Sequence, residues 1–99
     1  MAFNLVVTYT AELDIEKAVD WYNSKQEALG QRFYNAVLSE FAIIQKHPNY
    51  YSFYSKGFRK TLVKQFPYLI IFKITNQDII IYTVIYGGRN PEIINKRMA

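Results

Sequence analysis

The chain has 99 residues, 51% of them hydrophobic and 17% aromatic, which suffices for one packed core without room for a second, so we expect a single domain over residues 1–99. It holds no cysteine, which excludes a disulfide scaffold and a zinc–thiolate site and suits a reducing cytoplasm. The net charge is +4, and the positive charge is concentrated in residues 51–99, which contain eight Lys and Arg but only two Asp and Glu. This distribution predicts a surface for nucleic acid or an acidic partner.

Hydrophobic spacing predicts a strand and then two helices in the first half of the chain. The β-branched and aromatic run at 3–9 is typical of a strand. Apolar residues then recur at helical spacing, with Thr10 placed as the N-cap, and Gly30 marks the break before a second helix that ends at Pro48. The two apolar stripes, which we expect in the core of an antiparallel helical hairpin, are Ala11, Ile15, Ala18, Val19 and Tyr22, and Phe33, Val37, Phe41 and Ile44.

The second half of the chain predicts a loop and three strands. Residues 49–57 are rich in Tyr and Ser and indicate the loop, and the strands follow at 58–65, 68–75 and 79–86. A short polar turn joins the last two strands, which should pair as an antiparallel hairpin. The expected order is β-α-α-β-β-β, an α+β fold in which the helical hairpin packs on one face of a small antiparallel sheet. A last helical turn is expected after this sheet, with Pro91 at its first position.

Most catalytic chemistries find no support in the sequence. The single histidine, His47, precedes Pro48 and is interpreted as a residue of a helix end rather than a catalytic or metal-binding one. The serines have no surrounding triad and the glycines form no phosphate-binding loop, so we expect no metal and no cofactor. The carboxylates of the helices are interpreted as a solvated face. No apolar run approaches the roughly 20 residues of a membrane span, and the N-terminus is not typical of a signal peptide, so we expect a cytoplasmic protein without a membrane partner.

Cationic and aromatic side chains remain as candidates for function. Strand alternation places Lys60 and Lys64 on one face of the sheet and Arg59 on the other, unless a bulge intervenes, and Lys73 lies on the next strand. Cations neutralise phosphates and aromatic rings stack on unpaired bases. A cation and a general acid or base such as Tyr, His or Lys can also cleave RNA without a metal.

Arg89 is the strongest single candidate. It directly follows Gly87 and Gly88 at the end of the last predicted strand. A rigid strand would hold this arginine, and the two glycines would leave room for a ligand.

The chain resembles, nearly end to end, the toxins of the RelE/ParE superfamily from type II toxin–antitoxin pairs. The strongest segments are "FRKTLVKQFPYLIIF" (58–72), similar to the family's Arg…Phe-Pro-Tyr…Ile strand pair, and "VIYGGRNP" (84–91), similar to its terminal His-Gly-x-Arg-x-Pro. The helices carry "DWY" (20–22) and "LG..F" (29–33), a pattern more typical of the ParE side. The resemblance implies a helical hairpin on a small antiparallel sheet.

The resemblance implies a toxin that an acidic antitoxin neutralises. ParE-type members bind DNA gyrase and inhibit growth, whereas RelE-type members are endoribonucleases that cut mRNA on the ribosome. We favour gyrase binding for two reasons. Tyr86 stands where many active RNases have histidine, and Lys64 falls near the position at which those RNases have a second phosphate-binding arginine, so that a lysine replaces it here. The mRNA endoribonuclease is the alternative, and an inactive relative that retains only antitoxin binding is a third. The expected assembly is a toxin–antitoxin hetero-oligomer or a homodimer.

The resemblance also implies roles for individual residues. In the RNase alternative, Arg89 would bind the scissile phosphate, Lys64 would supply a second phosphate contact, and Tyr86 would donate a proton. Under either mechanism the target-binding residues would be Arg89, Lys60, Lys64, Lys56 and Arg59, of which Arg59 is interpreted as partly structural.

Overall fold

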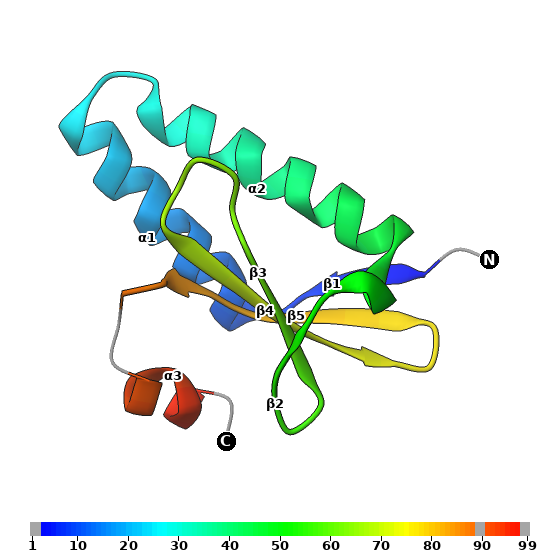
Figure 1. The fold of residues 1–99 in the computed structure, drawn as a ribbon. Coiled ribbons are helices and arrows are strands. Elements are labelled where there is room, and N and C mark those ends of the chain that lie inside the picture. The colour runs from blue at the N-terminus through cyan, green and yellow to red at the C-terminus, as the bar shows by residue number, and fades with distance from the viewer. Residues whose placement is uncertain (1–2, 89–90, 98–99) are drawn as a thin grey trace.

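A computed structural model describes residues 3–88 and 91–97 as a helical hairpin, a sheet and a short C-terminal helix (Figure 1). The elements are β1 (Asn4–Val7), α1 (Tyr9–Lys25), α2 (Leu29–Lys46), the 3-10 helix η1 (Pro48–Tyr50), β2 (Phe53–Ser55), β3 (Phe58–Leu62), β4 (Tyr68–Thr75), β5 (Asp78–Tyr86) and α3 (Pro91–Arg97). In the described ranges no helix is long and apolar enough to cross a membrane.

The five strands form one mixed sheet in the order β1-β5-β4-β3-β2. The predicted α+β class and the hairpin of β4 and β5 are confirmed. The sheet is not wholly antiparallel, however, because β1 pairs in parallel with β5, with Leu5 opposite Ile79. Parallel neighbours need a long crossover, and here the whole chain from α1 to β4 supplies it. Local spacing carries no signal of that pairing.

The loop predicted at 49–57 contains an additional strand, β2, so the helices and strands before α3 follow one another along the chain in the order β-α-α-β-β-β-β. Ser55 pairs with Phe58 across the turn of Lys56 and Gly57, whose φ angles are 49° and 85°. Positive φ at both central residues is what a tight hairpin between right-twisted strands requires. The strand escapes prediction because it has only three residues and shows no alternation.

Strand β3 is shorter than predicted. It ends at Leu62, and the Phe66 amide donates to the Val63 carbonyl at 3.2 Å in a turn that contains Lys64. The adjacent Gln65 has a φ of 71°, which a strand cannot accommodate. Lys64 therefore lies in the turn between β3 and β4, and the predicted alternation does not extend to it.

Both helix starts differ from the predicted positions. The N-cap of α1 is Thr8, not Thr10, and its hydroxyl oxygen accepts from the Ala11 amide at 3.2 Å. The break between the helices precedes Gly30, which is the second residue of α2 and donates its amide to the Asn23 side chain at 2.8 Å. A Cβ at position 30 would lie 2.4 Å from the Val19 carbonyl oxygen, so this glycine permits the close crossing of α1 and α2.

Apolar residues are buried on both faces of the sheet. The predicted helical stripes form the larger cluster, against the face that α1 and α2 cover, although Val19 is only partly buried. A second cluster lies on the opposite face, where Ile94 of α3 packs with Phe58, Ile71 and Ile85. Burial on two faces explains why β4 and β5 are almost continuously apolar instead of alternating.

Candidate functional site

A groove of about 510 Å³ lies between α1 and the C-terminal half of β5. Strand β1 pairs with β5 only as far as Ile81, so from Tyr82 onward this edge of β5 continues past the end of β1. Side chains of α1 stand beside the edge instead. The groove is lined by Asp14, Lys17, Ala18, Trp21, Tyr22, Pro67, Tyr68, Val84, Ile85, Tyr86 and Arg97.

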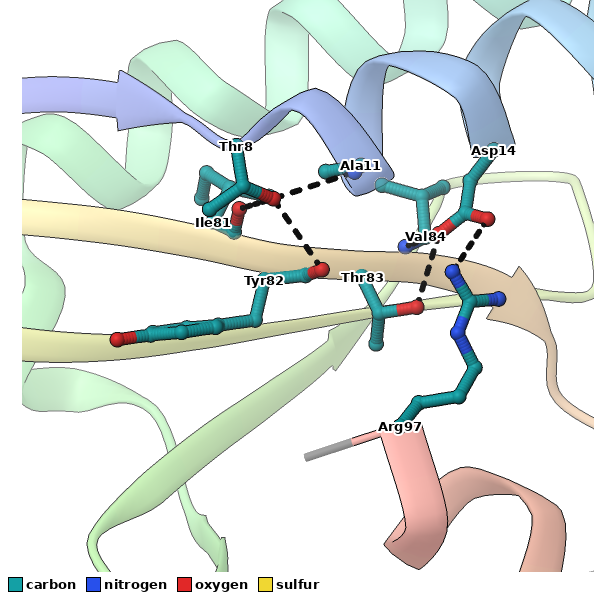
Figure 2. A network of polar contacts seen from close by, with 8 residues as sticks. All are labelled: Thr8, Ala11, Asp14, Ile81, Tyr82, Thr83, Val84 and Arg97. Carbon is teal, nitrogen blue, oxygen red and sulfur yellow. Dashed lines mark hydrogen bonds and ion pairs between the residues drawn. The ribbon is translucent and has the colours of Figure 1, made fainter. Parts of the chain in front are cut away.

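The carboxylate of Asp14 lines this groove and is the centre of a network of polar contacts, which Figure 2 shows. It accepts hydrogen bonds from the Thr83 hydroxyl at 2.9 Å and from the Val84 amide at 3.1 Å, so it satisfies a backbone donor at the edge of β5. The guanidinium of Arg97 donates to it at 2.7 Å, and the two side chains are only 11% (Asp14) and 27% (Arg97) exposed.

This network joins three elements that are distant in the sequence. Asp14 lies on α1, Thr83 on β5 and Arg97 on α3, so the short C-terminal helix is anchored to the rest of the fold. The interpretation of Asp14 as part of a solvated face was wrong. Its partners are 69 to 83 residues away, and no spacing rule reveals them.

The wall of the groove is aromatic. Trp21 and Tyr86 are about half exposed, whereas Tyr22 is buried between them and the core. Burial raises the pKa of Tyr22 above its ordinary value of 10.0, and the nearby Tyr68 and Tyr86 raise it further. The Tyr68 and Tyr86 rings meet edge to face, with centroids 6.1 Å apart. The exposed rings of Trp21 and Tyr86 are therefore each supported by a packed tyrosine, Tyr22 for Trp21 and Tyr68 for Tyr86, and are accessible to a protein partner.

The glycines after β5 have a role inside the chain. A Cβ at Gly88 would lie 2.6 Å from a ring carbon of Tyr86, so this position must be small for the tyrosine ring to lie where it does. Gly87 donates its amide to the Pro67 carbonyl at 2.8 Å. Neither glycine has a positive φ. The room expected for a ligand is thus occupied, at Gly88, by the ring of Tyr86.

Arg89, the strongest candidate from the sequence, lies outside the described residues. Its proposed contact with the target stays a prediction. Among the described residues just before it, Tyr86 lines the groove, whereas Gly87 lines a smaller hollow on the face of the sheet that carries α3.

The remaining predicted cations divide between the two faces of the sheet. Lys60 is exposed on the face that carries α3, with its Nζ 5.7 Å from the Tyr54 ring centroid, and it lines a smaller hollow of about 370 Å³. On the neighbouring strand the Lys73 Nζ lies 5.2 Å from the Phe58 ring centroid. Lys56 is exposed in the hairpin turn between β2 and β3. The α3 face thus presents lysines over aromatic rings.

Arg59 has a structural position on the face that carries the helical hairpin. Its Nη1 donates to the Tyr51 carbonyl at 2.7 Å and to the Asn49 carbonyl at 3.4 Å, so it ties the segment after α2 to β3. The guanidinium lies 4.0 Å from the Phe53 ring centroid. These contacts agree with the interpretation of Arg59 as partly structural, and they separate it from Lys60.

In the described part of the chain, no group of three or more His, Asp or Glu side chains is arranged to hold a metal ion. The candidate site is built from aromatic rings, cations and one partly buried carboxylate. Such a set suits the recognition of a macromolecule.

Comparisons with known proteins agree with this fold. The family model described as "ParE toxin of type II toxin-antitoxin system, parDE" matches residues 5–91. A solved structure described as "Chromosomal ParDE TA system from P. aeruginosa" superimposes with a TM-score of 0.77, covers 85% of this chain and 95% of that chain, and is 16% identical in sequence. At this identity the likeness shows the fold alone. A search of curated proteins finds no match.

Proposed function

The chain belongs to the ParE toxin family of type II toxin–antitoxin systems, and we propose that it inhibits growth by binding DNA gyrase until an acidic antitoxin neutralises it. The observation that carries the proposal is the family match over residues 5–91. We place the protein in the cytoplasm, where gyrase and the antitoxin act, in a hetero-oligomer with that antitoxin.

The groove beside β5 is the surface that we assign to gyrase. Its exposed Trp21 and Tyr86 are residues of the kind that dominate the binding energy of protein interfaces, and Lys17 adds a cation on the same side. The Asp14 network holds strand, helix and α3 in fixed relation, so little ordering is needed on binding. Arg89 follows this surface in the chain, and we assign it a charge-assisted contact with a carboxylate of the target.

The opposite face supports the second part of the proposal. Lys60 and Lys73 lie there with Lys96 on the exposed side of α3, which suits a helix or extended tail of an acidic antitoxin. Contacts between exposed charges weaken with salt because ions screen them beyond about 10 Å at 0.1 M. We expect the affinity for the antitoxin to fall between 50 and about 500 mM salt, roughly tenfold or more. A partner that bound only the acidic helices, without salt dependence, would contradict this assignment.

Direct binding of the purified chain to purified gyrase subunits tests the proposed target. Arg89→Ala should weaken binding by about 2 kcal/mol, roughly 30-fold, while the free energy of unfolding changes by less than about 0.5 kcal/mol. Tyr86→Phe keeps the ring and should bind nearly as the wild type does, whereas Tyr86→Ala should bind more weakly. Lys46→Ala, at the far end of α2, is the matched cation control and should have no effect. Arg89→Ala protein that is fully toxic at wild-type expression would contradict the assignment.

A further inference from the structure

We propose that the segment after α2 carries a binding site for single-stranded nucleic acid, built from His47, Tyr50, Phe53 and Arg59, which we call the aromatic patch. This site is separate from the groove assigned to gyrase, and the inference does not depend on that target. Bases would stack on the exposed rings, and neighbouring cations would contact the phosphates.

Two planar stacks are already formed in the patch. The His47 and Tyr50 rings are nearly parallel, at 8°, with centroids 5.0 Å apart. The Arg59 guanidinium lies 4.0 Å from the centroid of the Phe53 ring. The two stacks are linked through the backbone, since the same guanidinium donates to the carbonyl of Asn49, the residue before Tyr50 in the chain. Aromatic faces that are fixed in advance lose little conformational entropy when a base stacks on them.

The rings of the patch are turned to solvent and not to the core. Tyr50 is 83% exposed and Phe53 is 62% exposed. The neighbouring Tyr51 shows the contrast, since its ring packs edge to face on Phe72 and its hydroxyl approaches Glu40 at 3.5 Å. Within one short segment, therefore, one aromatic residue anchors the chain and two are mostly exposed to solvent.

The charge around the patch favours a polyanion. Residues 41–77 contain no Asp or Glu. Within them Lys46 directly precedes the patch in sequence, Lys56 lies between Phe53 and Arg59, and Arg59 belongs to the patch. Glu40, just before this range, is close to the Tyr51 hydroxyl and raises the pKa of Tyr51 after the larger effect of burial. Cations together with exposed ring faces match a single strand better than an acidic peptide, because a peptide offers charge but no stacking bases.

Fluorescence anisotropy with labelled dT12 and U12 oligonucleotides tests the proposal on the purified full chain. We expect salt-dependent binding of one or both, and the preferred polymer identifies whether DNA or RNA is the natural source. Tyr50→Leu and Phe53→Leu keep apolar bulk but remove the ring, and each should weaken binding roughly tenfold. Tyr9→Leu removes a ring that is 74% exposed on α1 and should change nothing.

Further variants separate stacking from unspecific attraction. Tyr50→Trp should keep the affinity, and its fluorescence should be quenched when an oligonucleotide binds. Lys46→Ala should lower the slope of log affinity against log salt by about 0.7. The proposal is overturned if an abasic oligonucleotide or polyglutamate binds as tightly as dT12 and U12, if neither oligonucleotide binds at low salt, or if Tyr50→Leu and Tyr9→Leu behave alike. Circular dichroism on each variant confirms that it is folded before binding is compared.

Discussion

Asp14→Ala should destabilise the fold more than any other removal of a helix carboxylate. The substitution leaves the Val84 amide and the Thr83 hydroxyl without their acceptor, and Thr83 is 1% exposed, so water cannot readily replace the carboxylate. A buried donor that loses its partner costs about 1–3 kcal/mol, and the partly exposed pair with Arg97 adds up to about 1 kcal/mol. We expect a loss of about 3 kcal/mol in the free energy of unfolding.

Variants of the same network divide this loss into its parts. Asp14→Asn keeps an oxygen acceptor but loses the charge, and Arg97→Ala removes only the cation, so each should cost about 1 kcal/mol. Asp20→Ala is the matched control, since it removes an exposed carboxylate from the same helix and should stay within about 0.5 kcal/mol of the wild type. Urea denaturation followed by circular dichroism measures all four variants. If Asp14→Ala and Asp20→Ala unfold at the same urea concentration, the carboxylate does not hold β5 and α3 together.

Three further predictions concern the helices and the aromatic core. Gly30→Ala places a Cβ 2.4 Å from the Val19 carbonyl oxygen, so α1 and α2 must separate and the melting temperature should fall. Ala42→Gly, on the exposed side of α2, is the control and should lower the free energy of unfolding by only about 1 kcal/mol. Val37→Asp puts a charge at a position that is 0% exposed and should unfold the domain, and a wild-type melt would show that this helix face is assigned wrongly. Because the pKa of Tyr22 is raised in the folded state, the unfolded chain loses the proton of the Tyr22 hydroxyl at a lower pH than the folded chain does. The contribution of Tyr22 to the free energy of unfolding is therefore complete below about pH 10 and declines above it. Tyr22→Phe should flatten that decline when denaturation is measured between pH 9 and pH 11.

Repeating apolar patterns made the helices and the long strands predictable. The stripe of α2 is buried at Phe33, Val37, Phe41 and Ile44 because a helix buries one face against the sheet, whatever strands lie under it. Strand β4 has the predicted bounds, since its apolar residues and the flanking turn signals are all local. The α+β class follows from the order of these elements alone.

Features that depend on distant residues were not predictable. Thr8 and not Thr10 caps α1 because β1 ends at Val7, and that end is set by pairing with β5. Lys64 falls in a turn because Gln65 adopts a positive φ, which a β-rich pattern conceals. Such positions follow from tertiary contacts, and a single sequence does not display them.

The candidate site was predictable only in part. Tyr86 was identified from the resemblance, as the residue that stands where many active RNases have histidine, and it does line the groove. Asp14 and Trp21 were missed as site residues, because a carboxylate and an aromatic ring on a helix normally belong to the solvated face and the core. The feature that could have identified Trp21 is its place beside Tyr22, since adjacent helix residues cannot both face the core.

Inhibition of gyrase-catalysed DNA supercoiling by the purified chain, measured beside primer extension on cellular mRNA after induced expression, tests the proposed target most directly. We predict inhibited supercoiling that an acidic antitoxin relieves, and mRNA 5′ ends that match those of uninduced cells. Normal supercoiling together with new mRNA ends at ribosomal A-site codons would contradict the proposal and support the endoribonuclease.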